Sequence, residues 1–263
     1  MASPLKVDAR AAVEISGIQK TFSSARGAVQ ALTETSLAIA PGQFVSIVGP
    51  SGCGKSTLLS LIAGLDAPSA GRILIEGQEV RGPHDSLGVV FQRDLLLDWR
   101  TAMDNVLLQV EMRNLPPRDY AARARELLDM VGLQGFHGSY PRELSGGMRQ
   151  RVAICRALLH NPLLLLMDEP FGALDAISRD RLNVDLGRIC SETKKTVVFI
   201  THSINEAVFL GDRVVVMSSR PGKVVADLSI EVPHPRDLSF RETPEFAGYV
   251  RQVRKIFEAE GVL

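Results

Sequence analysis

A nine-residue loop, residues 49–57, constrains the fold of this 263-residue chain more than any other feature. It fits the pattern GxxxxGK[ST], follows the apolar run Phe44–Val48 and precedes a helical pattern that starts near Lys55. In this order of strand, turn and helix, the glycines let backbone N–H groups point at phosphate oxygens, and the helix N-terminus adds positive potential. An ordinary glycine-rich turn is the competing interpretation, and the pair Lys55 and Ser56 argues against it.

The rest of the chain predicts an α/β fold with a helical insertion. Residues 13–48 indicate strands and turns, whereas residues of about 93–160 change to helical spacing. Beyond the insertion, strand-like runs alternate with a helix expected over Asp175–Thr193. These runs are Leu163–Met167, Thr196–Thr201 and Val214–Met217. The alternation predicts a largely parallel sheet that helices cover on both faces.

Composition narrows the possible functions. The chain has 30 basic and 30 acidic residues, with no block of like charge, so a nucleic-acid-binding role is disfavoured. The three cysteines, Cys53, Cys155 and Cys190, form no CxxC pair, which fits a reducing compartment. The N-terminus has no apolar core of a secretory signal, and no apolar run approaches the roughly 20 residues that span a bilayer. We therefore expect a protein that is soluble by itself and reaches a membrane only through a partner.

Two carboxylates, Asp168 and Glu169, follow the apolar run Leu163–Met167 directly. Ligands of open α/β sheets bind outside the carboxyl ends of the strands. Asp168 is therefore expected to hold Mg²⁺, directly or through water, and Glu169 to polarise an attacking water as a base. Without the phosphate loop, a buried strand with a solvated acidic end would be the better interpretation.

A second anion-binding turn is predicted at Ser145, Gly146 and Gly147, which open a helix expected to run to about Leu159. Serine is a favourable N-cap, and glycines leave backbone N–H groups unobstructed. Taken alone, these three residues would more often be a plain cap and turn. Together with the loop at 49–57, they give one chain two candidate phosphate-binding surfaces.

In combination, these residues resemble the nucleotide-binding subunit of ATP-binding cassette (ABC) transporters, over nearly the whole chain and in the family's order. Six motifs carry the resemblance: the Walker A loop at 49–57, the Q-loop glutamine Gln92, the signature at 144–150, Walker B at 163–169, the D-loop at 173–175 and the switch histidine His202. The family implies an α/β P-loop NTPase core with a mixed sheet, an N-terminal antiparallel β-subdomain and an inserted α-helical subdomain.

The resemblance also implies domain boundaries and an assembly. We expect the nucleotide-binding domain at residues 13–244, with the helical lobe at about 93–160, and a short C-terminal helical tail at 245–263. The family forms a head-to-tail homodimer, in which each ATP lies between the Walker A loop of one chain and the signature of the other. On this view, the second phosphate-binding surface serves the partner's nucleotide.

The residue roles that the resemblance implies involve ATP and Mg²⁺. Catalysis is expected from Glu169, His202 and Gln92, where His202 contacts the γ-phosphate and Gln92 senses the γ-phosphate and the metal. Metal ligation is expected from Ser56, Gln92 and Asp168. The residues expected to contact the nucleotide are Phe22, Gly49, Pro50, Ser51, Gly52, Cys53, Gly54, Lys55, Ser56, Thr57, Gln92, Ser145, Gly146, Gly147 and Asp175.

Two positions depart from the common family pattern. The family usually stacks a tyrosine on adenine near the N-terminus, and the candidate here is Phe22, which can stack but lacks the hydroxyl. The signature ends in Met148, Arg149 and Gln150 instead of the commonest Gly-Gln ending, whereas its phosphate-facing Ser-Gly-Gly is intact.

The segment after Gln92 is a candidate docking site. Three leucines and the only tryptophan, Trp99, lie within residues 94–105, where the family docks a helix of the membrane permease. Packing of these side chains within the helical lobe is an equally good interpretation.

Four stretches are similar to the nitrate, sulfonate and taurine subgroup of importers: residues 91–106, 201–210, 219–223 and 232–244. This subgroup implies a subunit at the cytoplasmic face of the inner membrane, with permease subunits and, indirectly, a solute-binding protein as partners. The alternative function is a soluble ABC ATPase of the iron–sulfur assembly type, which the motifs do not exclude. Translation-type ABC factors carry two cassettes and chromosome-type members carry a long coiled coil, and the sequence shows neither.

Cys53 lies inside the phosphate loop. We expect that alkylation of its thiol blocks ATP binding and that bound ATP protects it. The alternative is that the side chain points away from the nucleotide and that alkylation is harmless.

Overall fold

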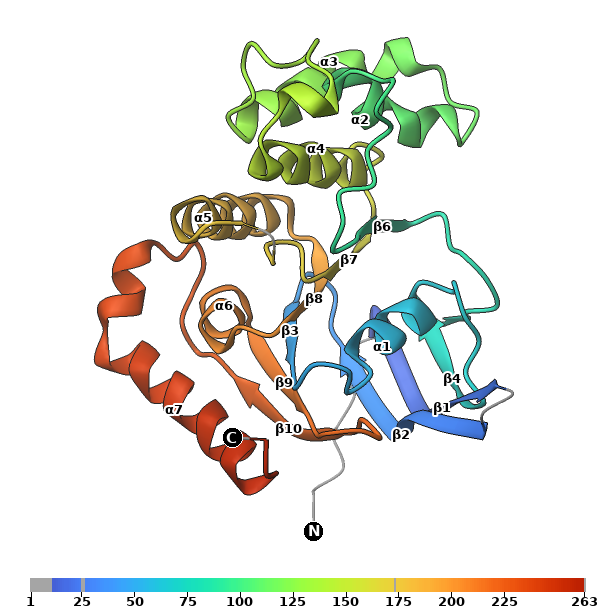
Figure 1. The fold of residues 1–263 in the computed structure, drawn as a ribbon, viewed down its shortest axis with the longest axis vertical. Coiled ribbons are helices and arrows are strands. Elements are labelled where there is room, and N and C mark those ends of the chain that lie inside the picture. Colours follow the sequence, from blue (N-terminus) through green and yellow to red (C-terminus); the bar gives the residue numbers. More distant parts are fainter. Residues whose placement is uncertain (1–10, 25–26, 173, 263) are drawn as a thin grey trace.

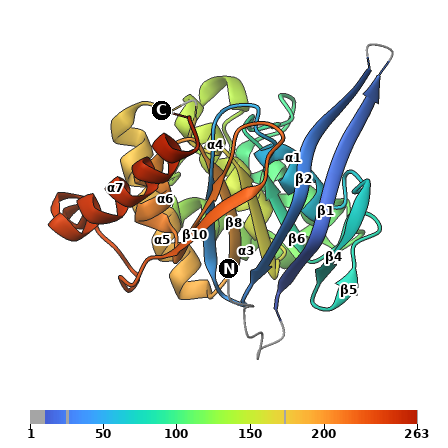
Figure 2. The same ribbon diagram turned by 90° about the horizontal axis from the view of Figure 1, so that it is seen from below.

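The computed structural model describes residues 11–24, 27–172 and 174–262, which form two sheets and a separate group of helices (Figure 1). The smaller sheet has four antiparallel strands in the order β2-β1-β4-β5. Its strands are β1 (Val13–Ser24), β2 (Gly27–Ile39), β4 (Ala70–Ile75) and β5 (Gln78–Glu79). The long hairpin of β1 and β2 extends beyond the rest of the molecule (Figure 2). This sheet confirms the predicted N-terminal antiparallel subdomain.

The larger sheet is mixed and has the order β10-β9-β3-β8-β7-β6. Its strands are β3 (Phe44–Val48), β6 (Leu87–Val90), β7 (Leu164–Asp168), β8 (Thr196–Thr201), β9 (Arg213–Met217) and β10 (Val224–Ser229). All neighbouring strands are parallel except β10, which pairs antiparallel with β9. The predicted parallel core is therefore present, with one antiparallel strand at its edge.

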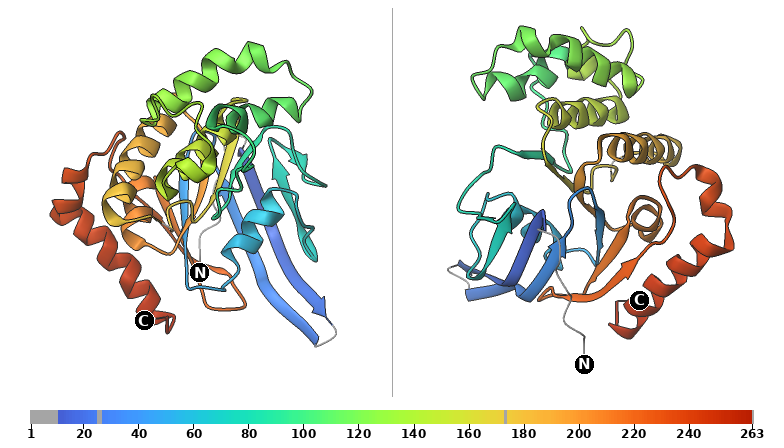
Figure 3. Two further views of the ribbon diagram at one scale, coloured as in Figure 1. Left: turned by 45° about the horizontal axis from the view of Figure 1, so that its top comes forward. Right: turned by 180° about the vertical axis from the view of Figure 1, so that it is seen from behind.

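Both faces of this sheet are buried, as a continuous apolar strand sequence predicts. Phe44 and Val48 of β3 belong to one hydrophobic cluster, and Val45 and Ile47 belong to another. On one side lie α5 (Ala176–Thr193), α6 (Ile204–Leu210) and α7 (Pro244–Ala259), and on the other lie α1 (Lys55–Ile62) and the antiparallel sheet (Figures 1 and 3). A short 3₁₀ helix, η2 (Leu238–Glu242), precedes α7.

The remaining helices form a lobe between β6 and β7. They are α2 (Ala102–Glu111), α3 (Pro117–Met130), the 3₁₀ helix η1 (Pro141–Glu143) and α4 (Gly146–Leu158). Figure 1 shows this lobe at one end of the molecule, separated from the antiparallel sheet. Pro117 stands at the first position of α3, as predicted, because its missing N–H would have no partner there.

The strand register brings three chain segments to one edge of the sheet. Val48, the last residue of β3, pairs with Thr201 of β8, and Asp168 of β7 pairs with Ile200. Because β3, β8 and β7 are adjacent and parallel, the segments that follow them begin side by side. These segments are the phosphate loop, His202 and Glu169.

Several sequence expectations need correction in detail. Residues 93–101 contain no helix, so the first helix of the lobe begins only at Ala102. The strand β10 and the helix α2 were not predicted as separate elements, and α7 begins at Pro244 instead of after it. The prediction that the N-terminus is not a secretory signal concerns residues 1–10, which lie outside the described residues. Within the described parts of the chain, no helix has the length and apolar character needed to cross a membrane.

Candidate functional site

The phosphate loop turns tightly between β3 and α1. Gly54 is the N-cap of α1 and has a φ of 110°, which L side chains rarely adopt. A Cβ at this position would lie 2.7 Å from Leu32 Cδ2 and 2.9 Å from the carbonyl oxygen of Ala31. Both the backbone angle and the available space therefore require glycine at the point where the loop enters the helix.

Lys55 lies folded into the loop that contains it. Its side chain is 5% exposed, and its Nζ donates hydrogen bonds to the carbonyl oxygens of Gly49 at 2.9 Å and Pro50 at 3.0 Å. A buried ammonium group needs such partners, because desolvation without them is costly. The amine is thus held beside the loop, where phosphate oxygens could replace the two carbonyls.

Ser56 and Asp168 are in direct contact, as the sequence predicts for two ligands of one cation. Ser56 Oγ donates to Asp168 Oδ1 at 3.1 Å. Burial raises the pKa of the Asp168 carboxyl above its ordinary value and outweighs the hydrogen bond from Ser56, which lowers it, and the charge of Glu169 adds to the rise. A hydroxyl and a carboxylate are oxygen ligands of the kind that Mg²⁺ prefers, and a nearby cation would favour the ionised carboxylate.

Glu169 and His202 form a second pair at the same edge. His202 Nδ1 lies 3.2 Å from Glu169 Oε2, and Glu169 is only partly exposed. Glu169 has a φ of 43°, an uncommon conformation for a residue other than glycine, and its N–H donates to the carbonyl oxygen of Ile200 at 2.9 Å. Backbone strain of this kind persists only where the surroundings enforce it, and it clusters at functional sites.

A cavity of about 330 Å³ joins these features. Its lining consists of Phe22, Ala31, Ser51, Gly52, Gly54, Lys55, Ser56, Thr57, Gln92, Glu169 and Arg220. The Phe22 ring is 42% exposed, and Lys20 Nζ lies 4.8 Å from its centroid. Of the phosphate-loop residues predicted to contact a nucleotide, Gly49, Pro50 and Cys53 are not part of the lining among the described residues.

The second predicted anion site lies on a different surface. Ser145 caps α4, with its Oγ accepting from the N–H of Met148 at 3.3 Å, and Ser145 and Gly146 are exposed. None of the three Ser-Gly-Gly residues lines the nucleotide cavity. Asp175 caps α5 by accepting from the N–H of Ser178 at 3.0 Å, and Ala173 of the predicted D-loop lies outside the described residues. The structure therefore places the two predicted phosphate-binding surfaces of the chain apart from each other.

Comparison with known proteins identifies this arrangement. Residues 32–172, more than half of the chain, match the family model described as ABC transporter. The chain belongs to the ABC transporter family. It is the ATP-binding and ATP-hydrolysing component of that family, with the P-loop NTPase fold predicted from its motifs.

Relatives of this ABC ATPase align over most of their length. The taurine import ATP-binding protein of Rhizobium johnstonii is 48% identical over 88% of this chain and 90% of its own. The nitrate import ATP-binding protein of Synechocystis is 43% identical over 93% and 94%, and the aliphatic sulfonates import ATP-binding protein of Bacillus cereus is 41% identical over 95% and 98%. The resemblance to this importer subgroup is confirmed, and nothing in these comparisons favours the iron–sulfur assembly alternative.

A solved structure supports the same assignment. The dimeric post-hydrolysis state of an ATP-binding cassette bound to ADP and Pi is 34% identical in sequence, with a TM-score of 0.73. The alignment covers 84% of this chain and 100% of that one. The ABC ATPase thus shares its fold with a cassette that holds the products of ATP hydrolysis.

One part of the nucleotide cavity of the ABC ATPase was missed by the sequence analysis. Arg220 lines the cavity and belongs to the loop that follows β9. This loop is fastened to β2, because the N–H of Gly222 donates to Ala31 O at 2.9 Å and the N–H of Thr33 donates to Gly222 O at 3.0 Å. A Cβ at Gly222 would lie 2.0 Å from the carbonyl oxygen of Cys53. The rule that ligands bind at the carboxyl ends of parallel strands, applied to β9, would have indicated this loop.

The side chain of Cys53 faces the interior of the ABC ATPase. It is 1% exposed and belongs to the hydrophobic cluster around α1 and the antiparallel sheet. Burial raises the pKa of its thiol, although the charge of Lys55 acts in the opposite direction. The structure therefore supports the alternative in which the side chain points away from the nucleotide.

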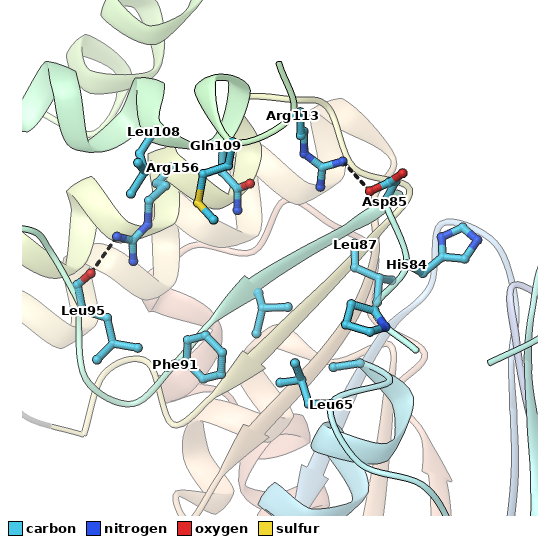
Figure 4. A pocket seen from close by; sticks show the side chains of 14 residues that line it. Leu65, His84, Asp85, Leu87, Phe91, Leu95, Leu108, Gln109, Arg113 and Arg156 are labelled. Atoms are coloured by element: carbon cyan, nitrogen blue, oxygen red, sulfur yellow. Dashed lines mark hydrogen bonds and ion pairs between the residues drawn. The ribbon is translucent and has the colours of Figure 1, made fainter. Parts of the chain in front are cut away.

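A larger groove of about 500 Å³ lies beside the nucleotide cavity, between the end of α1, β6 and the helical lobe (Figure 4). Leu65, Leu87, Phe91 and Leu95 contribute apolar side chains to it. Two cations border it: Arg156 Nη1 donates to the carbonyl oxygen of Leu95 at 2.8 Å, and Arg113 pairs with Asp85 at 3.3 Å. Trp99, in the same segment of the ABC ATPase as Leu95, is 74% exposed, so it does not pack within the lobe as the competing interpretation held.

Proposed function

We propose that this chain is the ATPase subunit of an importer that takes up a small solute of the nitrate, sulfonate or taurine type through a separate permease. The observation that carries the proposal is that the phosphate loop and the Ser-Gly-Gly turn, the two predicted phosphate-binding surfaces, lie apart within one chain. The names of the relatives, which are import ATP-binding proteins for these three solute classes, support the direction and the class of transport. We further propose residues 13–244 as the nucleotide-binding domain, with the lobe at about 93–160, and residues 245–263 as a tail.

The proposed dimer is a head-to-tail pair of identical chains. In it, the cavity around Lys55 holds ATP, and Ser145, Gly146 and Gly147 of the second chain close over the γ-phosphate. The N-terminus of α4, where Ser145 and Gly146 are exposed, is suited to bind an anion brought by another molecule. The known dimeric cassettes of similar fold support this arrangement. Asp175, exposed at the start of α5, would lie near the partner.

Within each nucleotide site, Glu169 is proposed as the general base and His202 as its orienting partner. The distance of 3.2 Å between Glu169 Oε2 and His202 Nδ1 fixes the orientation of the Glu169 carboxylate, and a fixed carboxylate favours one position for the attacking water. Gln92 lines the cavity and is proposed to sense the γ-phosphate. Phe22 is proposed to stack on adenine, because its exposed aromatic ring lines the cavity.

The residues around Ser56 fit a magnesium ion. Asp168 and Ser56 would hold it, with Gln92 as a third candidate, and the ion would neutralise charge on the phosphate oxygens. Among the described residues no group of three or more His, Cys, Asp or Glu could hold a metal ion. A site with one carboxylate suits Mg²⁺, which is usually bound through one or two carboxylates together with phosphates of the substrate.

The groove in Figure 4 is proposed as the docking site of the permease. An amphipathic helix places apolar residues into such a groove. Leu95 lines it, and Trp99, four residues further along the chain, is exposed. Because Phe91 lines the groove and Gln92 lines the nucleotide cavity, neighbouring residues connect the two. This contact would place the subunit at the cytoplasmic face of the inner membrane, and a solute-binding protein would act on it only through the permease.

The experiment that tests this function is reconstitution with the permease encoded beside this chain. Proteoliposomes that contain both, with ATP on the side of this subunit, should accumulate one of nitrate, taurine or an alkanesulfonate when the matching solute-binding protein is present. The Glu169→Gln variant serves as the inactive control. Co-purification with soluble assembly proteins, in place of a membrane permease, would contradict the proposal.

A further inference from the structure

An ion pair between a partly exposed arginine and a buried glutamate connects Leu174 of the predicted D-loop to the segment that carries His202. Glu206 of α6 is 6% exposed, and its Oε1 lies 3.5 Å from Nε of Arg179 on α5. The same guanidinium donates from Nη2 to the carbonyl oxygen of Leu174 at 3.1 Å. One arginine thus contacts both the loop before α5 and the helix after His202.

The other carboxylate oxygen of Glu206 continues this connection. Glu206 Oε2 accepts a hydrogen bond of 2.5 Å from Oγ1 of Thr201, which is itself buried. Thr201 Oγ1 in turn accepts from the N–H of Ser203 at 3.0 Å. Thr201 and Ser203 are the two neighbours of His202, so this network fixes the backbone on both sides of the histidine.

At its opposite end, the connection reaches the signature turn. The side chain of Leu174 is 9% exposed, and a Cβ placed on Gly147 would lie 3.5 Å from its Cδ2. Leu174 therefore lies at contact distance from the beginning of α4, where Ser145 and Gly146 are exposed. A displacement of this turn would press on Leu174, whose carbonyl oxygen is bonded to Arg179.

We propose that Arg179 and Glu206 are positioning residues that link the signature turn of a chain to His202 of the same chain. The inference rests on the proposed head-to-tail dimer, in which that signature turn contacts the partner's ATP while His202 serves the chain's own ATP. Closure over one nucleotide then sets the position of the histidine at the other. The two ATP sites of the dimer are coupled through each chain as well as across the interface.

A purely structural role for the ion pair makes a different prediction. If Arg179 only holds α5 against α6, its loss lowers thermal stability and leaves the turnover of the folded protein unchanged. If it positions His202, its loss lowers kcat and the cooperativity of ATP hydrolysis while ATP binding to the separated subunits persists. The double variant also discriminates, because two residues that act as one unit are non-additive.

The test compares Arg179→Met, Glu206→Gln and the double variant in the full-length chain. Glu206→Gln keeps a side-chain oxygen for Thr201. We expect kcat to fall about tenfold in each single variant, as for a loosened positioning contact, and the double variant to match the slower single variant within about twofold. The Hill coefficient for ATP should fall towards 1, with unchanged affinity for ATP in the absence of dimerisation. Arg179→Lys should restore turnover only in part, because lysine lacks the fork that reaches two partners.

Asp180→Asn is the matched control. Asp180 is the next residue of α5 and pairs with Arg241 of η2, which lies over the ring of Phe209 on α6. The variant therefore loosens the same α5–α6 region without removing the hydrogen bonds to Leu174 and Thr201. The loss of the Asp180 carboxylate should leave kcat and cooperativity at the wild-type level. Three results would each overturn the inference. They are an equal loss of kcat in Asp180→Asn, an unchanged Hill coefficient in both single variants, and additive losses of kcat in the double variant. If Glu169→Gln forms no ATP-bound dimer, the proposed head-to-tail dimer is wrong, and this inference is wrong with it. If that dimer forms but the Arg179 and Glu206 variants keep the wild-type cooperativity, only this inference is wrong.

Discussion

His202 Nδ1 lies 3.2 Å from Glu169 Oε2, although 33 positions separate the two residues in the sequence. They meet because the strands that precede them, β8 and β7, are parallel neighbours. The contact gives the proposed base a fixed orientation at the edge of the nucleotide cavity.

The first prediction concerns this base. Glu169→Gln keeps the shape and the contact with His202 but removes the proton acceptor, so kcat should fall by about 10²–10⁴-fold while ATP still binds. The variant should accumulate as an ATP-bound dimer, which size-exclusion chromatography with ATP would detect. Asp180→Asn, which removes a carboxylate on α5 away from the cavity, should hydrolyse ATP at the normal rate. Unchanged turnover in Glu169→Gln would exclude Glu169 as the base.

The second prediction concerns Phe22. Removing the ring by Phe22→Ala should weaken ATP binding by about 1 kcal/mol, or roughly fivefold, because a stacked aromatic contact contributes on this order. Phe22→Tyr should retain the affinity. Equilibrium titration with a fluorescent ATP analogue measures both. An exposed aromatic of the helical lobe, Phe136, provides the control, and an equal loss in Phe136→Ala would show that the effect is not local.

The third prediction concerns Trp99. Since its side chain is 74% exposed, Trp99→Ala should cost little stability, and the unfolding temperature should stay within a few degrees of the wild type. The variant should lose association with the permease in detergent while its ATPase activity in solution is intact. Phe136→Ala should bind the permease normally. Loss of folding in Trp99→Ala would refute the docking role, because the residue would then be structural.

The fourth prediction concerns Cys53. Its burial and the raised pKa of its thiol leave little reactive thiolate at neutral pH, so alkylation by iodoacetamide should be slow with or without ATP. Unfolding in guanidinium chloride should restore the rate of a free thiol. Mass spectrometry of the peptide that contains Cys53 follows the reaction. Rapid alkylation of the folded protein, with protection by ATP, would instead support a thiol that faces the nucleotide.

The fifth prediction concerns pH and stability. Burial raises the pKa of Glu206 above its ordinary value, and the hydrogen bond from Thr201 opposes this rise only in part. A carboxyl whose pKa is higher in the folded state stabilises the fold below its unfolded pKa of about 4.5, and this contribution is lost as pH rises through the folded pKa.

Glu206→Gln removes this titration. The stability of the wild type relative to Glu206→Gln should therefore decrease as pH rises from below about 4.5 towards neutrality, which urea unfolding at several pH values can measure. A difference in the free energy of unfolding that does not change with pH would contradict the assignment. The same variant is expected to be slow in turnover, so stability and activity would respond in opposite directions near neutral pH.

The sequence predicted those parts of the site that depend on chain order alone. A glycine-rich turn follows β3, and two carboxylates lie at the end of β7. These parallel strands flank β8, so the parallel rule brings both segments to one edge of the sheet. Ser56 and Asp168 were both predicted as ligands of Mg²⁺, and the structure brings them into contact. The helix starts at Pro117 and Ser145 were also predicted correctly, because capping is a local property.

Contacts that depend on side-chain packing were not predictable. The parallel-strand rule indicates the loop after β9, but it does not indicate that Arg220 lines the cavity, because that placement depends on hydrogen bonds between Gly222 and β2. The direction of the Cys53 side chain is likewise set by its neighbours in the core. For Trp99 the sequence allowed two interpretations, because the spacing of apolar residues does not distinguish a core residue from a residue exposed at a binding surface.

Gly222 has one further consequence, for the genetics of this protein. Its lack of a side chain lets the loop after β9 rest on the backbone of Cys53, where a single methyl group would collide with the carbonyl oxygen at 2.0 Å. On a linear map of mutations, codon 222 lies far downstream of the phosphate-loop codons. An allele altered there would nevertheless group by phenotype with the phosphate-loop alleles, since both deform the same turn.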